Sequence, residues 1–186
     1  MKTWIFCGVI IFAMSLSAQA ASRGITGQPA PAWNVEEWFN VGSDATRPDI
    51  GDFEGQIVYL YCFQSWCPGC HASGFPSLRA VHEAFKGDEE VAFVAIQTVF
   101  EGFHANTLDH AKEIAKEYEL TMPIGHSGSK TERPALMTAY RTGGTPWTIV
   151  IDRDGVVRFN DFHLKPEQAI TMINALKKKA ATKASE

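Results

Sequence analysis

The chain has 186 residues, of which 45% are hydrophobic and 11% aromatic, so it is long and apolar enough to bury the core of one domain. It carries 17 basic and 21 acidic side chains, for a formal net charge of −4. This balance argues against nucleic acid and against an anionic membrane surface as binding partners.

Residues 1–20 have the features of a secretory signal peptide. Lys2 supplies one positive charge, residues 4–16 form an uncharged and mostly apolar run, and residues 18–20 (AQA) form a small-x-small cleavage site. The apolar run is too short to span a bilayer comfortably. We therefore expect cleavage after Ala20 and a periplasmic or secreted protein, attached to a membrane only if this segment is retained.

The remaining chain is expected to form one domain between two loose ends. Residues 21–28 are small and polar and predict a flexible leader. The domain is predicted to span residues 29–179, and residues 180–186 are predicted to be a disordered tail. No repeat or low-complexity stretch divides the domain.

Strands and helices are predicted to alternate along this domain. The predicted strands are residues 57–63, 91–96, 122–125, 147–151 and 156–159. The predicted helices are residues 71–86, interrupted at Pro76, residues 106–118, residues 134–140, and a last helix that Pro166 opens. The two apolar runs IVYLYCF and VAFVAI are typical of buried strands, and residues 152–155 (DRDG) are a strong hairpin signal. This order predicts an α/β sandwich around one sheet.

The stretch SWCPGCH at residues 65–71 carries the chemistry of the sequence. Cys67 and Cys70 have the C-x-x-C spacing of thiol–disulfide exchange enzymes. Cys67 is predicted to lie between a buried strand and a helix, where unpaired N–H groups and the helix dipole favour a thiolate and make it the attacking sulfur. Cys70 lies one turn inside the helix, where it is more shielded and suits the resolving role. Pro68 suits a first helical position because it has no N–H group to satisfy.

Adding His71 gives C-x-x-C-H, the spacing at which haem is attached in c-type cytochromes. Met122 could imitate a distal methionine ligand in such a protein. The predicted strands do not fit the mostly helical small c-type cytochromes, so we prefer the interpretation that His71 is a solvated helix residue that tunes the thiolate. No cofactor and no metal are therefore predicted.

Cys62 is the third cysteine outside the predicted signal peptide, and it lies in the middle of the strand predicted at residues 57–63. Free cysteines are often buried, so a core thiol is the expected interpretation. A third redox centre is the alternative.

The WCPGC motif after a buried strand, with Thr145-Pro146 entering another strand, resembles the thioredoxin fold. The closest resemblance is to its exported redoxin branch, the TlpA-like and AhpC/TSA-like proteins. The segment GQPAP at residues 27–31 also resembles the G-x-x-A-P opening common in that branch. The resemblance covers roughly residues 27–179 and implies a three-layer sandwich with a central mixed sheet flanked by helices.

The resemblance also implies roles for residues around the two cysteines. Pro146 would be a cis-proline packed against the redox pair, and Thr145, Pro146 and Trp66 would line the groove for the substrate. Pro68, Gly69 and His71 would tune the thiolate. The implied partners are protein thiols or disulfides and an unidentified redox protein, and we expect a monomer.

Three positions depart from the family pattern. Thioredoxins have a buried Asp six residues before the first cysteine, where this chain has Tyr61, and many TlpA-like reductases have a Glu where this chain has Ser73. The group that handles protons is therefore not identified by resemblance. The helix proline comes six residues after Cys70, at Pro76, rather than five, which predicts a bulge near Gly74.

The sequence therefore indicates an exported thiol–disulfide oxidoreductase, with two alternatives. A peroxidase would resemble P-x-x-x-T-x-x-C around its reactive cysteine, but Leu60 and Gln64 occupy the proline and threonine positions. A redox-inert domain that kept the fold and its proline groove would have unreactive or permanently paired cysteines. The C-x-x-x-C spacing of copper-carrying Sco-type proteins is absent.

Overall fold

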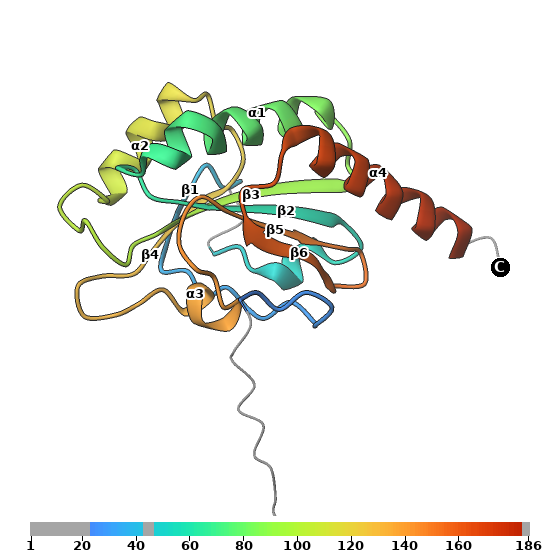
Figure 1. Cartoon of the computed structure of the whole chain (residues 1–186), viewed down its shortest axis with the longest axis horizontal. Coiled ribbons are helices and arrows are strands. Elements are labelled where there is room, and N and C mark those ends of the chain that lie inside the picture. Colours follow the sequence, from blue (N-terminus) through green and yellow to red (C-terminus); the bar gives the residue numbers. More distant parts are fainter. Residues whose placement is uncertain (1–22, 43–46, 184–186) are drawn as a thin grey trace, which may run out of the picture.

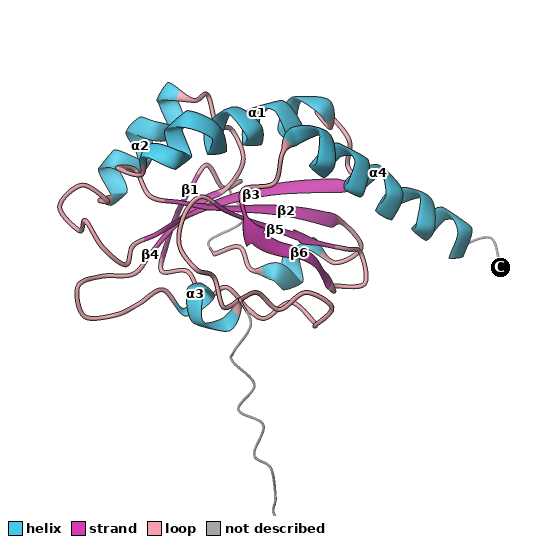
Figure 2. Cartoon of the chain, viewed as in Figure 1, coloured by secondary structure: helices cyan, strands magenta, loops and turns pink. Residues whose placement is uncertain are grey.

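The computed structural model describes residues 23–42 and 47–183, with side chains up to residue 179. The predicted signal peptide lies outside these residues. Six strands form one sheet in the order β1-β4-β3-β2-β5-β6, with helices on both faces (Figures 1 and 2). The strands are β1 (Glu37–Phe39), β2 (Ile57–Phe63), β3 (Val91–Thr98), β4 (Ile124–Ser127), β5 (Trp147–Ile151) and β6 (Val157–Phe162).

The helices include two short irregular turns. They are the 3₁₀ turn η1 (Ile50–Phe53), the π-helical turn η2 (Cys70–Gly74), α1 (Phe75–Ala84), α2 (Leu108–Glu117), α3 (Ala135–Ala139) and α4 (Pro166–Lys183). Helix α2 begins after Thr107, whose side chain accepts a hydrogen bond from the N–H of His110 at 3.2 Å. Helix α4 begins with Pro166, as predicted.

The central strand β2 is paired on both edges and covered on both faces. It runs parallel to β3 and antiparallel to β5, and all seven of its residues are buried. A strand covered on both faces needs apolar side chains at every position, which explains the unbroken run IVYLYCF. Strand β4 continues the parallel part of the sheet beside β3, and β6 pairs antiparallel with β5.

The two faces of β2 belong to two separate cores. Ile57, Tyr59, Tyr61 and Phe63 pack into the core beneath α1, α2 and α4, which lie on one face of the sheet in Figure 1. The alternate residues of β2 pack into the second core with residues of α3 and of the segment before β1. The period of two along the strand thus decides which core each side chain enters.

The predicted α/β sandwich is confirmed, and the structure adds two elements that the sequence did not indicate. Strand β1 pairs antiparallel with β4 at the edge of the sheet, through Glu37–Phe39 and Ile124–His126. It is only three residues long and none of them is fully buried, so it lacks the apolar run of an inner strand. The turn η1 has no buried residue, which explains why it was also missed.

Both predicted ends of the domain need correction. In the described part of the predicted leader, Ile25 is only 3% exposed and Gly27 donates a backbone hydrogen bond to the Val157 carbonyl at 2.7 Å. Residues 23–28 therefore pack on the domain and are not a loose leader. At the other end, α4 continues through Lys183, so the first four residues of the predicted disordered tail are helical.

The helix that follows the two cysteines starts with a π-helical turn, Cys70–Gly74, before it becomes α1. A π turn accommodates one extra residue in a helix, and this one lies where the late position of Pro76 predicted a bulge. Gly74 is required at its end, because a Cβ atom there would lie 1.9 Å from the Tyr61 hydroxyl oxygen and 3.1 Å from Pro146 Cβ.

We predict that Gly74→Ala lowers the free energy of unfolding by about 1–3 kcal/mol, because overpacking outweighs the better helix propensity of alanine. Adding Tyr61→Phe removes the shortest contact and should recover part of the loss. Gly51→Ala is the matched control, because a Cβ there meets nothing within 4 Å. Urea unfolding measures all four proteins, and a Gly74→Ala protein as stable as the wild type would show that the turn is not tightly packed.

Candidate active site

Cys67 and Cys70 lie where the chain leaves the end of β2 and enters the helix of η2 and α1. Both are free thiols. The backbone N–H of Cys70 donates a hydrogen bond to Cys67 Sγ at 3.4 Å, and Cys67 Sγ lies 3.5 Å from the carbonyl oxygen of Thr145, to which its S–H can donate. Cys67 is 8% exposed and Cys70 is fully buried. Of the two cysteines, Cys67 is therefore the one that keeps some exposure to solvent.

The start of the helix favours a negative charge on Cys67. Pro68 and Gly69 are the first residues with helical conformation, so Cys67 immediately precedes the helix. Unpaired N–H groups and the positive end of the helix dipole lie at this point. The Cys70 N–H, which also donates to the Cys67 carbonyl at 3.0 Å, is the direct contact through which the helix start acts on Cys67 Sγ.

The environment of Cys70 favours the protonated thiol. Burial, followed by the interaction with Cys67, raises the pKa of Cys70 to about 12, although contacts with the Gln64 backbone and the Tyr61 side chain act to lower it. Desolvation disfavours a charged sulfur in an apolar site. Of the two thiols, one turn apart, Cys70 is thus the more buried, and its burial disfavours the thiolate.

A second loop lies directly against this pair. The Thr145–Pro146 peptide bond is cis, as the resemblance implied. A Cβ atom added at Gly69 would lie 3.2 Å from Pro146 Cδ and 4.0 Å from Cys67 Sγ, so glycine lets the two loops approach closely. The structure therefore brings Cys67, Gly69, Thr145 and Pro146 together.

Two exposed aromatic residues lie beside these loops. Trp66 and Phe162 are the large hydrophobic side chains that are exposed among the described residues, at 45% and 39%. Trp66 precedes Cys67, and Phe162 packs on Trp147 with ring centroids 4.6 Å apart and lies near Gly144 of the proline loop. Phe162 was not identified from the sequence, because its place near this loop depends on the pairing of β5 with β6.

His71 is not the solvated helix residue that the sequence suggested. Its Nδ1 atom is 2.8 Å from the Tyr118 hydroxyl and its Nε2 atom is 2.7 Å from the Ser65 carbonyl. Because a carbonyl only accepts, Nε2 carries a hydrogen atom and donates it to Ser65. Both ring nitrogens are thus engaged in the protein, so in this orientation neither is available to bind iron.

Buried polar side chains hold the loop before Cys67. The Gln97 Oε1 atom of β3 accepts hydrogen bonds from the Ser65 hydroxyl and, at 3.2 Å, from the Ser65 N–H. The Asn106 Oδ1 atom accepts from the N–H of Trp66 at 3.3 Å. Gln97 Nε2 donates to the Thr107 carbonyl at 3.0 Å and to His126 Nδ1 at 2.8 Å. These residues were missed, since an isolated Gln within a strand and an Asn before a helix carry no functional signal.

Cys62 and Tyr61, both in β2, lie on opposite faces of the sheet, and only Tyr61 is on the face of the two site cysteines. Cys62 is buried on the face that packs with α3, whereas Cys67 and Cys70 belong to the core on the other face. Burial raises the pKa of the Cys62 thiol strongly, which fits the predicted core thiol. Tyr61, by contrast, points to the same side as the pair, and its hydroxyl touches the backbone at Gly74.

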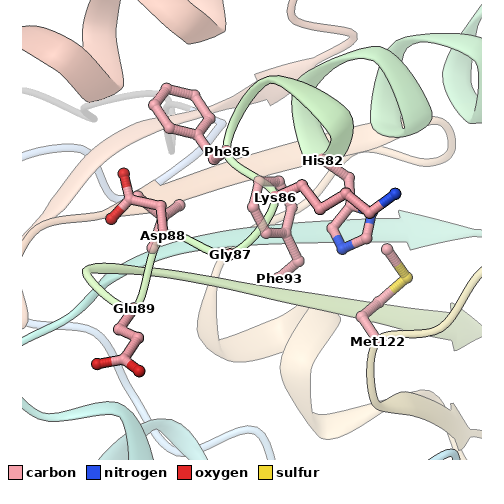
Figure 3. Close-up of a pocket in the computed structure, with 9 residues that line it drawn as sticks. His82, Phe85, Lys86, Gly87, Asp88, Glu89, Phe93 and Met122 are labelled. Atoms are coloured by element: carbon pink, nitrogen blue, oxygen red, sulfur yellow. The ribbon is translucent and has the colours of Figure 1, made fainter.

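A separate hollow of about 320 Å³ lies beneath the C-terminal end of α1, where Figure 3 shows His82, Phe93 and Met122 around it. It opens near Val91, at the start of β3, whereas Cys67 follows the end of the parallel strand β2. The ring of His82 packs edge-on against Phe93 with centroids 5.0 Å apart, and burial lowers its pKa. Met122 thus lines this hollow rather than the surroundings of His71.

Within residues 23–42 and 47–183, no three His, Cys, Asp or Glu side chains lie close enough together to hold a metal ion. Over the same part of the chain, no helix combines the length and apolar character needed to cross a membrane.

Comparisons with known proteins agree with this architecture. The profile of the Redoxin family matches residues 25–176. A thioredoxin-like superfamily protein superposes with a TM-score of 0.72 at 31% identity, over 80% of this chain and 95% of that chain. A thiol-disulfide isomerase from Corynebacterium glutamicum gives 0.69 at 25% identity, over 80% and 95%. A thioredoxin-family thiol:disulfide interchange protein from Chlorobium tepidum gives 0.60 at 21% identity, over 84% and 99%.

No curated protein matches the chain. The sheet order and these superpositions together confirm the predicted thioredoxin-like sandwich, with a mixed central sheet between two layers of helices.

We predict that stability falls as the pH drops below about 6.5, the ordinary pKa of histidine. Burial lowers the pKa of His126, an effect that Glu36 and Glu37 only partly offset, and its Nδ1 accepts from Gln97 as a neutral ring. The His126 ring therefore binds a second proton more readily in the unfolded chain than in the folded protein. The stability that depends on the neutral ring is fully present above this pH and is lost as the pH falls through the window below it.

Urea unfolding across this pH range measures the effect. In His126→Asn the amide oxygen can replace Nδ1 as acceptor without titrating, so the decline should be shallower. Part of the decline in stability should remain in this variant, because burial also lowers the pKa of His82. An equally steep decline in the variant would contradict the assignment to His126.

Proposed function

This chain belongs to the Redoxin family, and we propose that it is an exported thiol–disulfide oxidoreductase whose redox pair is Cys67 and Cys70. The observation that carries the proposal is the asymmetry of the two thiols. The sulfur of Cys67, the less buried of the two residues, accepts an N–H at the start of a helix, and the fully buried Cys70 lies one turn behind it. Disulfide exchange requires one sulfur that attacks and a second that waits in a shielded position.

The first step is attack by the Cys67 thiolate on a substrate disulfide. A new sulfur–sulfur bond forms between Cys67 and one substrate cysteine, and the substrate disulfide breaks. The other substrate sulfur leaves as a thiolate and takes a proton from solvent. The Cys70 N–H and the helix dipole stabilise the attacking charge before this step.

The second step releases the substrate. Cys70 loses its proton and attacks Cys67 Sγ, which forms the Cys67–Cys70 disulfide and breaks the mixed disulfide. The second substrate sulfur leaves with the electron pair and is protonated. The substrate has gained two electrons and two protons, and the pair has lost them, so no cofactor is needed and a partner protein must restore the dithiol.

The loops around Cys67 suit a peptide that carries a cysteine. The Thr145 carbonyl lies 3.5 Å from Cys67 Sγ, so backbone hydrogen-bonding groups border the reacting atom. The exposed side chain of Trp66, the residue before Cys67, offers apolar contact area, and the exposed ring of Phe162 lies near Gly144 of the proline loop. We infer that Thr145, Pro146 and Trp66 bind the substrate and that Phe162 extends this surface.

The direction of electron flow follows from how strongly the folded protein stabilises the thiolate. Pro68 and Gly69 place no charge and no imidazole between the two cysteines, and the ring of His71 is committed to Ser65 and Tyr118. The helix start alone should favour the thiolate moderately and leave the disulfide fairly stable. We propose a reductase or isomerase rather than a strong oxidase.

We predict that Cys67→Ser abolishes the reduction of insulin disulfides, because it removes the attacking sulfur. Cys70→Ser should retain the attack but accumulate mixed disulfides, visible as adducts by mass spectrometry without reductant. Cys62→Ala is the matched control: it removes a buried thiol of β2 that belongs to the opposite core, and it should keep exchange activity. Full activity in the Cys67→Ser protein would refute the proposed function.

A further inference from the structure

Tyr61 places a buried hydroxyl beneath the redox pair. Tyr61 is 1% exposed, and its ring packs edge-on against Phe75 with centroids 5.6 Å apart and stacks on Phe63 at 6.2 Å. These aromatic contacts aim the hydroxyl at the π turn, where a Cβ at Gly74 would lie 1.9 Å from it. The same turn begins with Cys70.

Among the residues that the structure describes, none forms a hydrogen bond with this hydroxyl. A buried polar group without a partner is costly, and native structures rarely keep one without a reason. Phenylalanine would fill the same space in this aromatic core without that cost. The groups that interact with the hydroxyl include the thiols of Cys70 and Cys67, which are the reacting atoms of the proposed function.

We propose that Tyr61 is a catalytic residue of the release step, in which its hydroxyl donates a hydrogen bond to the thiolate of Cys70. This role rests on the proposed function. The Tyr61 hydroxyl thereby gains an acceptor, the Cys70 thiolate, at the one stage of the reaction when Cys70 carries a charge. It also supplies a buried negative sulfur with a neutral donor where solvent cannot reach.

The ionisation behaviour of both groups is consistent with this role. Burial is the largest cause of the raised pKa of Cys70, and the nearby Tyr61 hydroxyl opposes it. Burial, followed by the charge of Cys70, raises the pKa of Tyr61 well above 10. Tyr61 therefore keeps its own proton at neutral pH, so it acts as a donor and not as a base.

The proposed hydrogen bond from Tyr61 does not change which bonds form and break in the release step. The proton that Cys70 loses balances the one that the departing substrate thiolate gains, while the Tyr61 O–H bond stays intact throughout. The sulfur–sulfur bond between Cys70 and Cys67 forms as the bond between Cys67 and the substrate breaks. Tyr61 only lowers the free energy of the Cys70 thiolate that must exist before this exchange.

Tyr61→Phe tests the proposal, because it removes the hydroxyl and keeps the ring. Tyr59→Phe is the matched control. Tyr59 lies two residues earlier on the same face of β2, is equally buried, and packs on Phe93 with centroids 5.6 Å apart. Only at Tyr61 does the hydroxyl lie against the turn that begins with Cys70.

The assay uses the reduced full domain and one equivalent of 5,5′-dithiobis(2-nitrobenzoate), which releases one coloured thiolate when Cys67 attacks and a second when Cys70 resolves the adduct. In Tyr61→Phe we expect the first release to be unchanged and the second to slow by about tenfold, the scale of a hydrogen bond to a charged group. The pH midpoint of the second release should also rise. Tyr59→Phe should match the wild type in both.

The outcomes separate this role from the proposed function. If the wild-type protein gives no second release, the proposed function fails. If it gives both and Tyr61→Phe matches it, or if Tyr59→Phe is equally slow, only the role of Tyr61 fails. Thermal unfolding of the reduced variant completes the test, because loss of an unpartnered hydroxyl should leave stability equal or higher. A less stable Tyr61→Phe protein would overturn the role by showing that the hydroxyl already has a partner.

Discussion

Strand β2 fixes the position of every group in the site. It is paired with β3 and β5, and all seven of its residues are buried between the two cores. A strand held on both edges and both faces cannot slip in register without moving apolar side chains between cores. Its end therefore places Cys67 with little freedom relative to β5, whose first residue follows Pro146. The approach of Cys67 Sγ to the Thr145 carbonyl depends on that arrangement.

The loop between β2 and the helix is held by polar contacts rather than by apolar packing. Gln97, Asn106 and His71 each bind backbone groups of Ser65 or Trp66. A buried loop must satisfy such groups, because each one left unpaired costs free energy. Gln97 belongs to β3, Asn106 precedes the helix cap Thr107, and His71 belongs to the π turn. The position of Cys67 thus depends on three separate parts of the chain.

The chemistry of the pair arises from unequal burial over one helical turn. Cys67 gains an N–H donor and access to solvent, whereas Cys70 is closed in by aromatic residues of β2 and α1. Ionising the buried sulfur is the expensive part of the cycle. The Tyr61 hydroxyl is buried beneath the pair, whereas the rings of Trp66 and Phe162 are exposed. Under the proposed function, substrate binding and release would therefore involve different surfaces near the same helix turn.

The sequence predicted most of the fold, because its main signals are local. The runs at Ile57–Phe63 and Val91–Ile96 are apolar at every position, which suffices to identify buried strands. The late position of Pro76 even indicated the bulge that the structure has as a π turn. The edge strand β1 was missed, because it depends on pairing with β4 and not on its own composition.

The residues around the cysteines were predictable only where a motif names them. Cys67, Cys70 and Pro146 follow from C-x-x-C and from the resemblance. Tyr61 stood out in the sequence only as a departure from the thioredoxin pattern, and no role followed from it. Gln97 and Phe162 become part of the site only through sheet register and packing, which bring together positions far apart in the chain. The packing of Ile25 was hidden for the same reason, since its segment is small and polar in sequence but hydrogen-bonded to β6 in the fold.

The central claim is that Cys67 and Cys70 form a reversible redox pair, and a redox titration in glutathione buffers tests it most directly. The fraction of oxidised protein is measured by thiol trapping and mass spectrometry. We predict one reversible two-electron transition, with a midpoint roughly between −180 and −270 mV, the range of isomerases and thioredoxin. A midpoint near −120 mV would contradict the proposed direction of electron flow. Cysteines that stay reduced or stay paired across the whole series would contradict the claim itself.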